Sequence, residues 1–301
     1  MKKIKLHKFK IKNQEIRAVL YLLPALLVIG VFQFYPIFKS FSMGFYTKFD
    51  YLTDTVFERG LDNFIYVLRD PEFLMALKNT FIFAFIAAPL GILAALVIAL
   101  ILNSNIKFKK FFRSAYFLPF VTSTTAVSIV WRWMLNKDYG VINAILGTFG
   151  MAKVSWLTDP KMTIPILIAL SIWKGLGYKI IIILAGLQSV DDRYELAGRM
   201  DGASKLRRLR YITLPLIKPT MVFLSITTLI SSFKIFDEVY ILYQQKPGPL
   251  QSGITIVYYI FEKFYREWEF SRAAAASFIL FVVILFITIV QFIFAARYKE
   301  E

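Results

Sequence analysis

The chain has 301 residues, of which 57% are hydrophobic and only 19% are charged, and its formal net charge is +16. A soluble domain of this size would carry more charge, and the mean hydropathy is +0.59. Cysteine is absent, His7 is the single histidine, and no G-x-x-x-x-G-K-[ST] motif occurs. These absences exclude disulfides, thiolate nucleophiles, histidine-based triads, histidine-rich metal sites and a P-loop for ATP. We expect a membrane protein that is not an enzyme and has no catalytic, metal or cofactor site.

Apolar runs long enough to cross a bilayer predict an all-α polytopic protein with about six transmembrane helices. A signal peptide is the alternative for the first run, but the run is long and no small-x-small cleavage site follows it. The predicted spans cover residues 18–38, 79–106, 114–131, 162–186, 214–239 and 273–296.

Loop charges predict the orientation of these spans. The segments 1–17, 103–113, 187–218 and 297–301 hold twenty Lys and Arg residues, against ten in 42–78, 137–161 and 237–270. Positive charge concentrates on the cytoplasmic side of membrane proteins. We therefore expect both termini and the 191–215 loop in the cytoplasm, with the protein crossing a membrane several times.

Two outer segments are also expected to be ordered. Residues 62–77 could form a short surface helix. Residues 254–261 are apolar but too few to cross the bilayer, which predicts an interfacial or re-entrant helix packed on the bundle.

The segment 190–215 is the longest strongly charged run between two apolar spans. Its pattern predicts one short helix over residues 191–198, with acidic residues in its first turn, and a basic helix over residues 203–210. Asp201 and Gly202 supply the turn between them. Two helices joined by a tight turn form a compact unit suited to docking on a partner.

This segment resembles the "EAA" cytoplasmic loop of ABC importer permeases, and is closest to the maltose-type, carbohydrate-uptake branch. The resemblance rests on Leu187-Gln-Ser-Val, Asp201-Gly-Ala-Ser and Ile212-Thr-Leu-Pro. Segments 21–46, 111–119, 131–143, 171–178 and 233–240 also look like segments common in sugar permeases. In that family the loop is a coupling helix seated in a groove of the ATPase. The resemblance thus implies that contact with an ATPase involves Glu195, Leu196, Ala197, Gly198, Met200, Asp201, Gly202 and Ala203.

One departure from the family pattern concerns the glutamate itself. Counting back from Asp201, the Glu-Ala-Ala of the family falls on Leu196, Ala197 and Gly198, and Glu195 lies one position earlier. One residue is about 100° on a helix, so Glu195 need not make the family's acidic contact. An ordinary basic cytoplasmic loop is the alternative for this segment.

Lysines inside a span are costly and usually face a cavity or a partner. Lys174 lies roughly 18 Å into its span, whereas Lys179 and Lys234 lie close enough to the ends to snorkel. Gly175 allows close approach of a ligand, and Tyr178 offers an aromatic face and a hydroxyl. The family resemblance implies that the translocation path is lined by Lys174, Gly175, Tyr178, Thr228, Ser231 and Ser232.

Each of these residues also has a structural alternative. Lys174 could pack between helices, and small hydroxyl residues often join membrane helices. For the polar patch of residues 122–125 and Ser128, helix packing is the favoured role. Lys174 and Lys234 could select an anionic saccharide, although similar lysines are ordinary in the family.

The resemblance implies a type I importer permease that spans the plasma membrane of a prokaryote several times and translocates a sugar or oligosaccharide. Its implied partners are a second homologous permease, two copies of a cytoplasmic P-loop ATPase and an extracellular solute-binding protein. We expect a basic tail at 1–17, a first span and outer loop at 18–78, a five-helix core at 79–297 containing the coupling loop 187–215, and a tail at 298–301. The alternatives are an ion-coupled secondary transporter, which the lack of acidic residues in the interior of the spans disfavours, and an assembly protein without a substrate.

Overall fold

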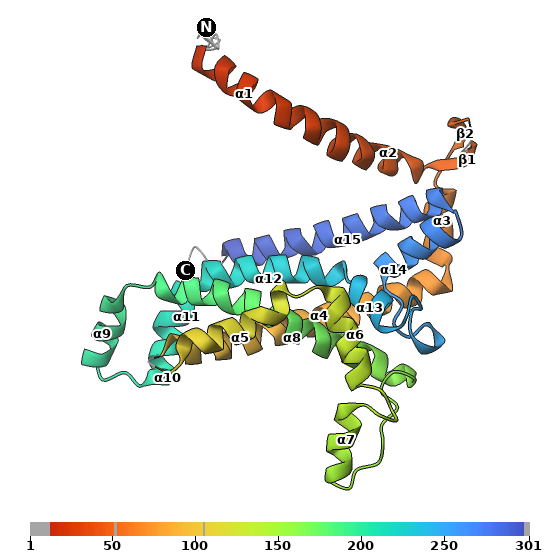
Figure 1. The fold of residues 1–301 in the computed structure, drawn as a ribbon. Helices are drawn as coiled ribbons and strands as arrows, with labels where there is room; N and C mark the ends of the chain where they lie inside the picture. The colour runs from red at the N-terminus through yellow and green to blue at the C-terminus, as the bar shows by residue number, and fades with distance from the viewer. Residues whose placement is uncertain (1–12, 51–52, 105, 298–301) are drawn as a thin grey trace.

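The computed structural model describes residues 13–50, 53–104 and 106–297. Most of the basic tail predicted at residues 1–17, His7 included, and the tail predicted at 298–301 lie outside the described residues. The described chain is mostly helical, and its long helices run roughly side by side (Figure 1).

The first predicted span is a continuous helix that stands apart from the others. It comprises α1 (Asn13–Ile29), the π-helical segment η1 (Gly30–Phe34) and α2 (Tyr35–Met43). None of its residues from 18 to 43 is buried. It packs through α2 against α15 (Phe270–Arg297) and diverges from that helix toward the N-terminus (Figure 1).

Three helices form the centre of the bundle. They are α4 (Pro71–Asn103), α8 (Pro160–Gln188) and α12 (Lys218–Phe233), and α15 covers one side. The face of α4 that is buried in the bundle is rich in alanine, including Ala84, Ala87, Ala88, Ala95 and Ala99. Small side chains at such positions let membrane helices approach closely.

Four helices are long and apolar enough to cross a membrane, and two bent pairs could each supply one more span. The uniform spans predicted at 114–131 and 214–239 are therefore wrong in shape. The first is broken into α5 (Lys109–Val121) and α6 (Thr124–Met134), which meet at 98°. Pro119 lies in the last turn of α5, and Thr122 has extended backbone that ends the helix.

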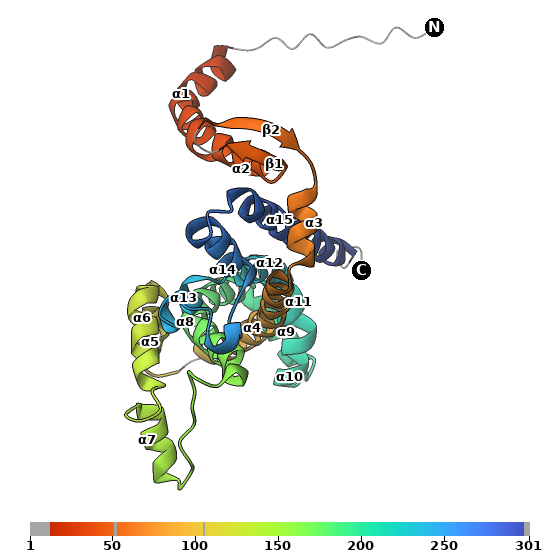
Figure 2. The same ribbon diagram turned by 90° about the vertical axis from the view of Figure 1, so that its right-hand side faces the viewer.

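The second bent pair joins the 190–215 segment to the bundle. Here α10 (Lys205–Arg208), the π-helical η2 (Leu209–Thr213) and α11 (Leu214–Leu216) meet α12 at 68°. The helix α9 (Asp192–Met200) precedes them and lies with α10 at one end of the molecule (Figures 1 and 2).

The opposite end contains short elements. An unpredicted antiparallel hairpin of β1 (Tyr46–Asp50) and β2 (Thr55–Arg59) pairs Tyr46 with Arg59 and Asp50 with Thr55. The surface helix expected over residues 62–77 stops early, because α3 (Asp62–Arg69) ends where the side chain of Asp70 caps α4. Prolines disfavour helical backbone in the preceding residue, and Pro71 begins α4.

The remaining outer elements are α7 (Val141–Thr148), which projects from the bundle, α13 (Asp237–Leu242), the 3₁₀ turn η3 (Pro249–Gln251), α14 (Ile256–Phe261) and the π-helical η4 (Glu262–Arg266). The apolar run at 254–261 is buried in the protein, and Tyr258 and Tyr259 are fully enclosed. The backbone N–H of Ile256 donates to Thr80 Oγ1 of α4 at 3.0 Å.

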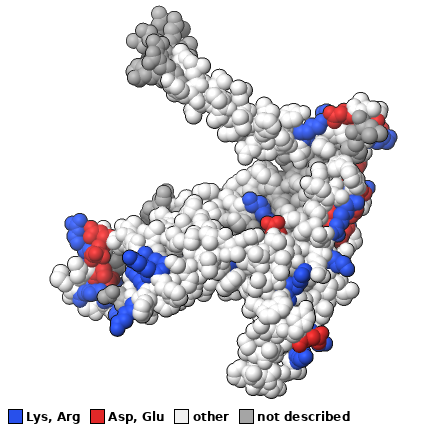
Figure 3. Space-filling view, in the orientation of Figure 1, with Lys and Arg blue, Asp and Glu red and all other residues white. Residues whose placement is uncertain are grey.

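Charged side chains gather at the two ends of this assembly. In the space-filling view the long middle of the visible face carries few Lys, Arg, Asp or Glu residues, whereas the α9–α10 end and the hairpin end carry many (Figure 3). This distribution fits a bundle whose middle lies in hydrocarbon.

Candidate functional site

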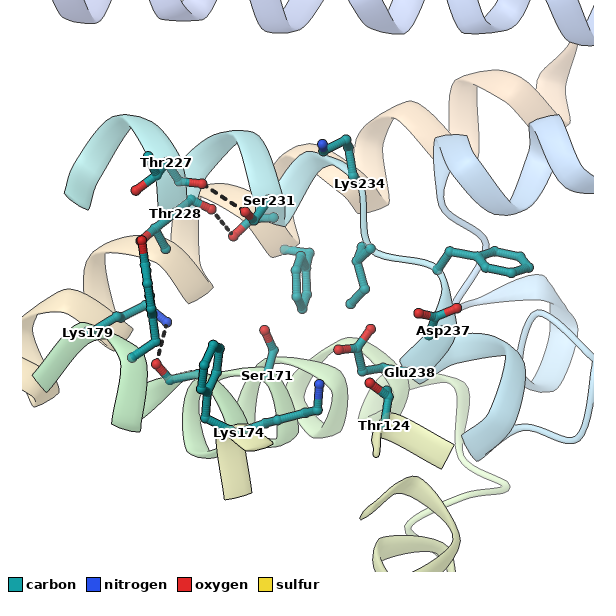
Figure 4. Close-up of a pocket in the computed structure, with 17 residues that line it drawn as sticks. Thr124, Ser171, Lys174, Lys179, Thr227, Thr228, Ser231, Lys234, Asp237 and Glu238 are labelled. Carbon is teal, nitrogen blue, oxygen red and sulfur yellow. Dashed lines mark hydrogen bonds between the residues drawn. The ribbon is translucent and has the colours of Figure 1, made fainter. Parts of the chain in front are cut away.

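A pocket of about 500 Å³ opens between α8, α12 and the turn that follows α12. Its wall also includes Phe83 of α4, Phe120 of α5 and Thr124 of α6 (Figure 4). Its polar lining residues are Thr124, Ser171, Lys174, Tyr178, Lys179, Thr227, Thr228, Ser231, Ser232, Lys234, Asp237 and Glu238.

All six residues expected along a translocation path line this one pocket. Lys174, Gly175 and Tyr178 come from one face of α8, and Thr228, Ser231 and Ser232 come from α12 opposite it. The structure thus brings together two sets of residues that lie at least 50 positions apart in the sequence.

The pocket combines hydroxyl groups with an aromatic surface. Tyr178 stacks on Phe120, with ring centroids 5.4 Å apart. The hydroxyls of Ser231 and Ser232 donate to the carbonyls of Thr227 and Thr228, each at 2.9 Å (Figure 4). A hydroxyl oxygen that donates its hydrogen still has two acceptor lone pairs, so these serines can accept hydrogen bonds from a ligand.

Lys179 does not snorkel to a helix end, and that expectation is wrong. Its side chain is buried, with a residue exposure of 8%, and it lines the pocket. Its Nζ donates a long hydrogen bond of 3.4 Å to the carbonyl of Gly175. Lys234 remains exposed, as a lysine near a helix end should be, but it also contributes to the pocket.

Two acidic residues reach the pocket from outside the long helices. The chain turns after α12, and α13 begins with Asp237 and Glu238, both of which line the pocket. Glu238 lies nearest the Lys174 amino group, and both acidic side chains lie at the end of the pocket opposite Lys179 (Figure 4). The sequence contains these residues in the 233–240 segment, but the apolar runs do not indicate that the chain folds back here.

The break between α5 and α6 places Thr124 at the pocket wall. Thr124 therefore also has a place in the pocket, besides the role in helix packing that the sequence favoured. Ser128 is fully buried, and its hydroxyl has no hydrogen-bond partner among the described residues. Broken helices at membrane depth typically line a cavity or a binding site. Pro119 followed by Thr122-Ser-Thr-Thr was the sequence signal for this break.

The second candidate site is the compact unit formed by α9, α10 and the turn between them. Glu195 Oε1 accepts a hydrogen bond from Arg208 Nε at 2.9 Å, and Arg199 lies 3.4 Å from the same oxygen. Gly202 has a φ of +71°, the left-handed backbone that glycine adopts without strain. Arg208 also donates to the carbonyl of Ala203.

The residues expected to contact an ATPase separate into two groups. Leu196 and Met200 are exposed by 55% and 86%, and Ala197, Asp201 and Gly202 are also exposed. Gly198 instead faces the interior of the unit. Glu195 and the carbonyl of Ala203 accept hydrogen bonds from Arg208 within it. Glu195 is thus hydrogen-bonded within the chain, and Leu196 and Met200 form an exposed apolar ridge on α9. Within the described residues, no group of three or more Asp, Glu, His or Cys side chains could hold a metal ion.

Comparison with known proteins identifies relatives across nearly the whole chain. The family model "Binding-protein-dependent transport system inner membrane component" matches residues 87–300. The lactose transport system permease protein LacF of Rhizobium radiobacter is 33% identical over 290 residues, which cover 95% of this chain and 96% of that protein.

Two solved structures share the fold. One is a bacterial ABC transporter involved in the import of the acidic polysaccharide alginate, with a TM-score of 0.84, 25% identity and coverage of 94% of this chain and 96% of that chain. The other is a bacterial alginate ABC transporter in complex with an alginate pentasaccharide-bound periplasmic protein, with a TM-score of 0.83, 25% identity and coverage of 92% and 93%.

Proposed function

This chain belongs to the family of binding-protein-dependent transport system inner membrane components, and we propose that it is the permease subunit of an ATP-driven importer for a sugar or oligosaccharide. The family match confirms the resemblance seen in the 187–215 segment. It also makes the chain a multi-pass protein of a prokaryotic inner membrane. The assignment to carbohydrate is supported by the relative that transports lactose and by the structural neighbour that imports alginate.

The observation that carries the substrate class is the pocket between α8 and α12. A carbohydrate presents hydroxyl groups and the apolar face of its ring, and the pocket offers hydroxyl acceptors with the stacked pair Tyr178 and Phe120. Lys174, Gly175, Thr228, Ser231 and Ser232 would contact the saccharide as it passes. The pocket volume of about 500 Å³ suits one or two sugar units at a time.

The importer would contain a second permease and two copies of a P-loop ATPase. The exposed apolar surface of α1 and α2 would contact the second permease. The ridge of Leu196 and Met200 on α9 would lie in the groove of the ATPase. An extracellular binding protein would dock on the outer elements and deliver the substrate, as the neighbouring complex with a periplasmic protein suggests.

In this scheme the 187–215 segment transmits the motion. Closure of the two ATPases on ATP would displace α9 and α10, and the 68° junction with α12 would pass this displacement to a wall of the pocket. The pocket would then change from inward to outward access, and ATP hydrolysis would reset it. The chain itself would carry out no covalent chemistry.

The proposal is tested by purifying the tagged chain from its native membranes in a mild detergent and identifying what co-purifies. We expect a P-loop ATPase and a second six-span permease in stable complex with it. Recovery of the chain alone, under conditions where it still transports substrate, would contradict the proposal.

A further inference from the structure

The buried side chain of Lys179 has a position that helix packing does not explain. Its ammonium group lies in a slot between two glycines, since a Cβ added at Gly91 of α4 would lie 3.5 Å from Nζ and one at Gly175 would lie 2.6 Å from it. Any larger residue at Gly175 would displace the amino group. These glycines leave room for a long cationic side chain where the two helices meet.

No described acidic side chain pairs with Lys179. Within 4.0 Å of its Nζ no ion pair is found among the residues that the structure describes, and the carbonyl of Gly175 at 3.4 Å is its one described hydrogen-bond acceptor. A buried charge without a counter-charge is costly. An anionic group bound beside Lys179 would offset that cost.

The other charges of the pocket are differently arranged. Lys174 points toward Glu238 and attracts its carboxyl group, without an ion pair within 4.0 Å between these two described residues (Figure 4). Lys234 is exposed, and Asp237 lies at the same end as Glu238. The acidic side chains would repel an anion at their own end, which leaves the end at Lys179 as the place for negative charge.

We propose that the pocket selects an acidic saccharide and holds its carboxylate or sulfate group against Lys179. The hydroxyls of α12 and the ring of Tyr178 would contact the rest of the sugar, and Lys179 would supply specificity for charge. This inference rests on the proposed transport function and extends it from carbohydrate in general to saccharides that carry an anionic group.

The test uses the intact importer with its binding protein in lipid nanodiscs and measures saccharide-stimulated ATP hydrolysis. The acidic probes are oligogalacturonates and carrageenan oligosaccharides. Their neutral counterparts are the methyl-esterified and desulfated forms, with lactose as a further neutral sugar. The wild-type complex should respond to one acidic set at a concentration about tenfold or more below that needed for its neutral form, because hydrogen bonds to charged groups are the stronger ones. The responding set identifies carboxylate or sulfate as the recognised group.

Lys179→Met keeps an unbranched side chain of similar volume, one heavy atom shorter, and removes its charge. We expect this variant to lose the preference for the acidic probe while retaining the response to the neutral form. Gly175→Ala, whose Cβ would displace the amino group, should weaken the same preference without removing the charge. The control is Lys107→Met, at an exposed position in the loop before α5, which should leave the preference unchanged.

Three outcomes would count against this account, and they are distinguishable. A wild-type response to neutral saccharides alone would overturn the inference and leave the carbohydrate importer intact. Equal loss of both responses in Lys179→Met, with the complex still assembled, would assign Lys179 a structural role. A response to no saccharide at all would overturn the proposed function itself.

Discussion

Glu195 and Arg208 form an ion pair that joins α9 to α10, with Arg208 Nε 2.9 Å from Glu195 Oε1 and the Arg208 side chain only 10% exposed. This contact turns two short helices into one unit. It also explains how the chain accommodates a glutamate displaced by one position from the family pattern. Glu195 stabilises the unit from within, while Leu196 and Met200 form its outer surface.

Replacing Glu195 by glutamine should loosen this unit. The Glu195→Gln change leaves the guanidinium of Arg208 nearly buried without a carboxylate, and such losses amount to about 1 to 3 kcal/mol. We expect hydrogen exchange of the α9 amides to rise roughly tenfold to a hundredfold. The control is Asp192→Asn in the exposed first turn of the same helix, which should change exchange far less. Unchanged protection in Glu195→Gln would mean that the ion pair does not hold α9.

Single cysteines can map the surface that meets the ATPase, because the chain contains no cysteine. Leu196→Cys and Met200→Cys should crosslink to the ATPase in the assembled complex, since both positions are exposed on α9. Gly198 is unsuited, because its Cβ would lie 2.8 Å from Ile212 Cδ1 inside the unit. Thr148→Cys, exposed on α7 at the other end, is the control. Crosslinks from Thr148→Cys but none from α9, in a complex that hydrolyses ATP, would reverse the docking assignment.

Gly177 lies at a close approach of α8 to the backbone of α5. A Cβ at this position would lie 2.5 Å from the carbonyl oxygen of Tyr116 and 2.8 Å from the Cα of Phe117, and both are backbone atoms. Gly177→Ala should therefore force the helices apart and destabilise the protein by about 1 to 3 kcal/mol. Thermal unfolding in detergent measures this as a lower melting temperature.

The matched control is Gly147→Ala on α7, where an added Cβ meets nothing within 4 Å. Alanine has the higher helix propensity, so this variant should be neutral or slightly stabilised. If Gly177→Ala melts no lower than Gly147→Ala, the close contact between α5 and α8 does not exist in the protein.

Asn143 organises the loop between α6 and α8. Its Nδ2 donates to the carbonyls of Lys137 and Val154, and its Oδ1 accepts from Val154 N and Trp156 Nε1. Asn143→Leu would remove all four hydrogen bonds, worth about 0.5 to 1.5 kcal/mol each. We expect faster proteolysis within residues 137–157 and unchanged cleavage elsewhere. The control Thr148→Ala, exposed on α7 in the same segment, should be cleaved like the wild type. Cleavage of Asn143→Leu at the wild-type rate would refute this role of Asn143.

The long helices could be located from the sequence because a helix that crosses the hydrocarbon core needs a long run of apolar residues. Sequence reasoning placed the start of α4 eight residues too late, since Asp70 and Pro71 begin the helix before the apolar run does. It also predicted two short helices around the Asp201–Gly202 turn, which α9 and α10 confirm. The acidic first turn of α9 and the backbone freedom of Gly202 are local properties, so the sequence suffices for them.

The features that escaped prediction depend on contacts between distant segments. The depth of Lys179 along its helix suggested snorkelling, but its burial is determined by Gly91, on another helix. Asp237 and Glu238 reach the pocket because the chain folds back after α12, which no periodicity indicates. The hairpin of β1 and β2 was missed because its charged, irregular strands lack a clear alternation of apolar and polar residues.

The most direct test of the central proposal is ATP-dependent uptake by the purified complex in liposomes, with the binding protein outside and a labelled oligosaccharide as probe. Uptake should require ATP inside the liposomes with the ATPases facing inward, and it should stop when the ATPase P-loop lysine is replaced. Saccharide uptake by this chain alone, driven by a proton or sodium gradient without ATP, would contradict the account and indicate an ion-coupled transporter in which Asp237 and Glu238 take part.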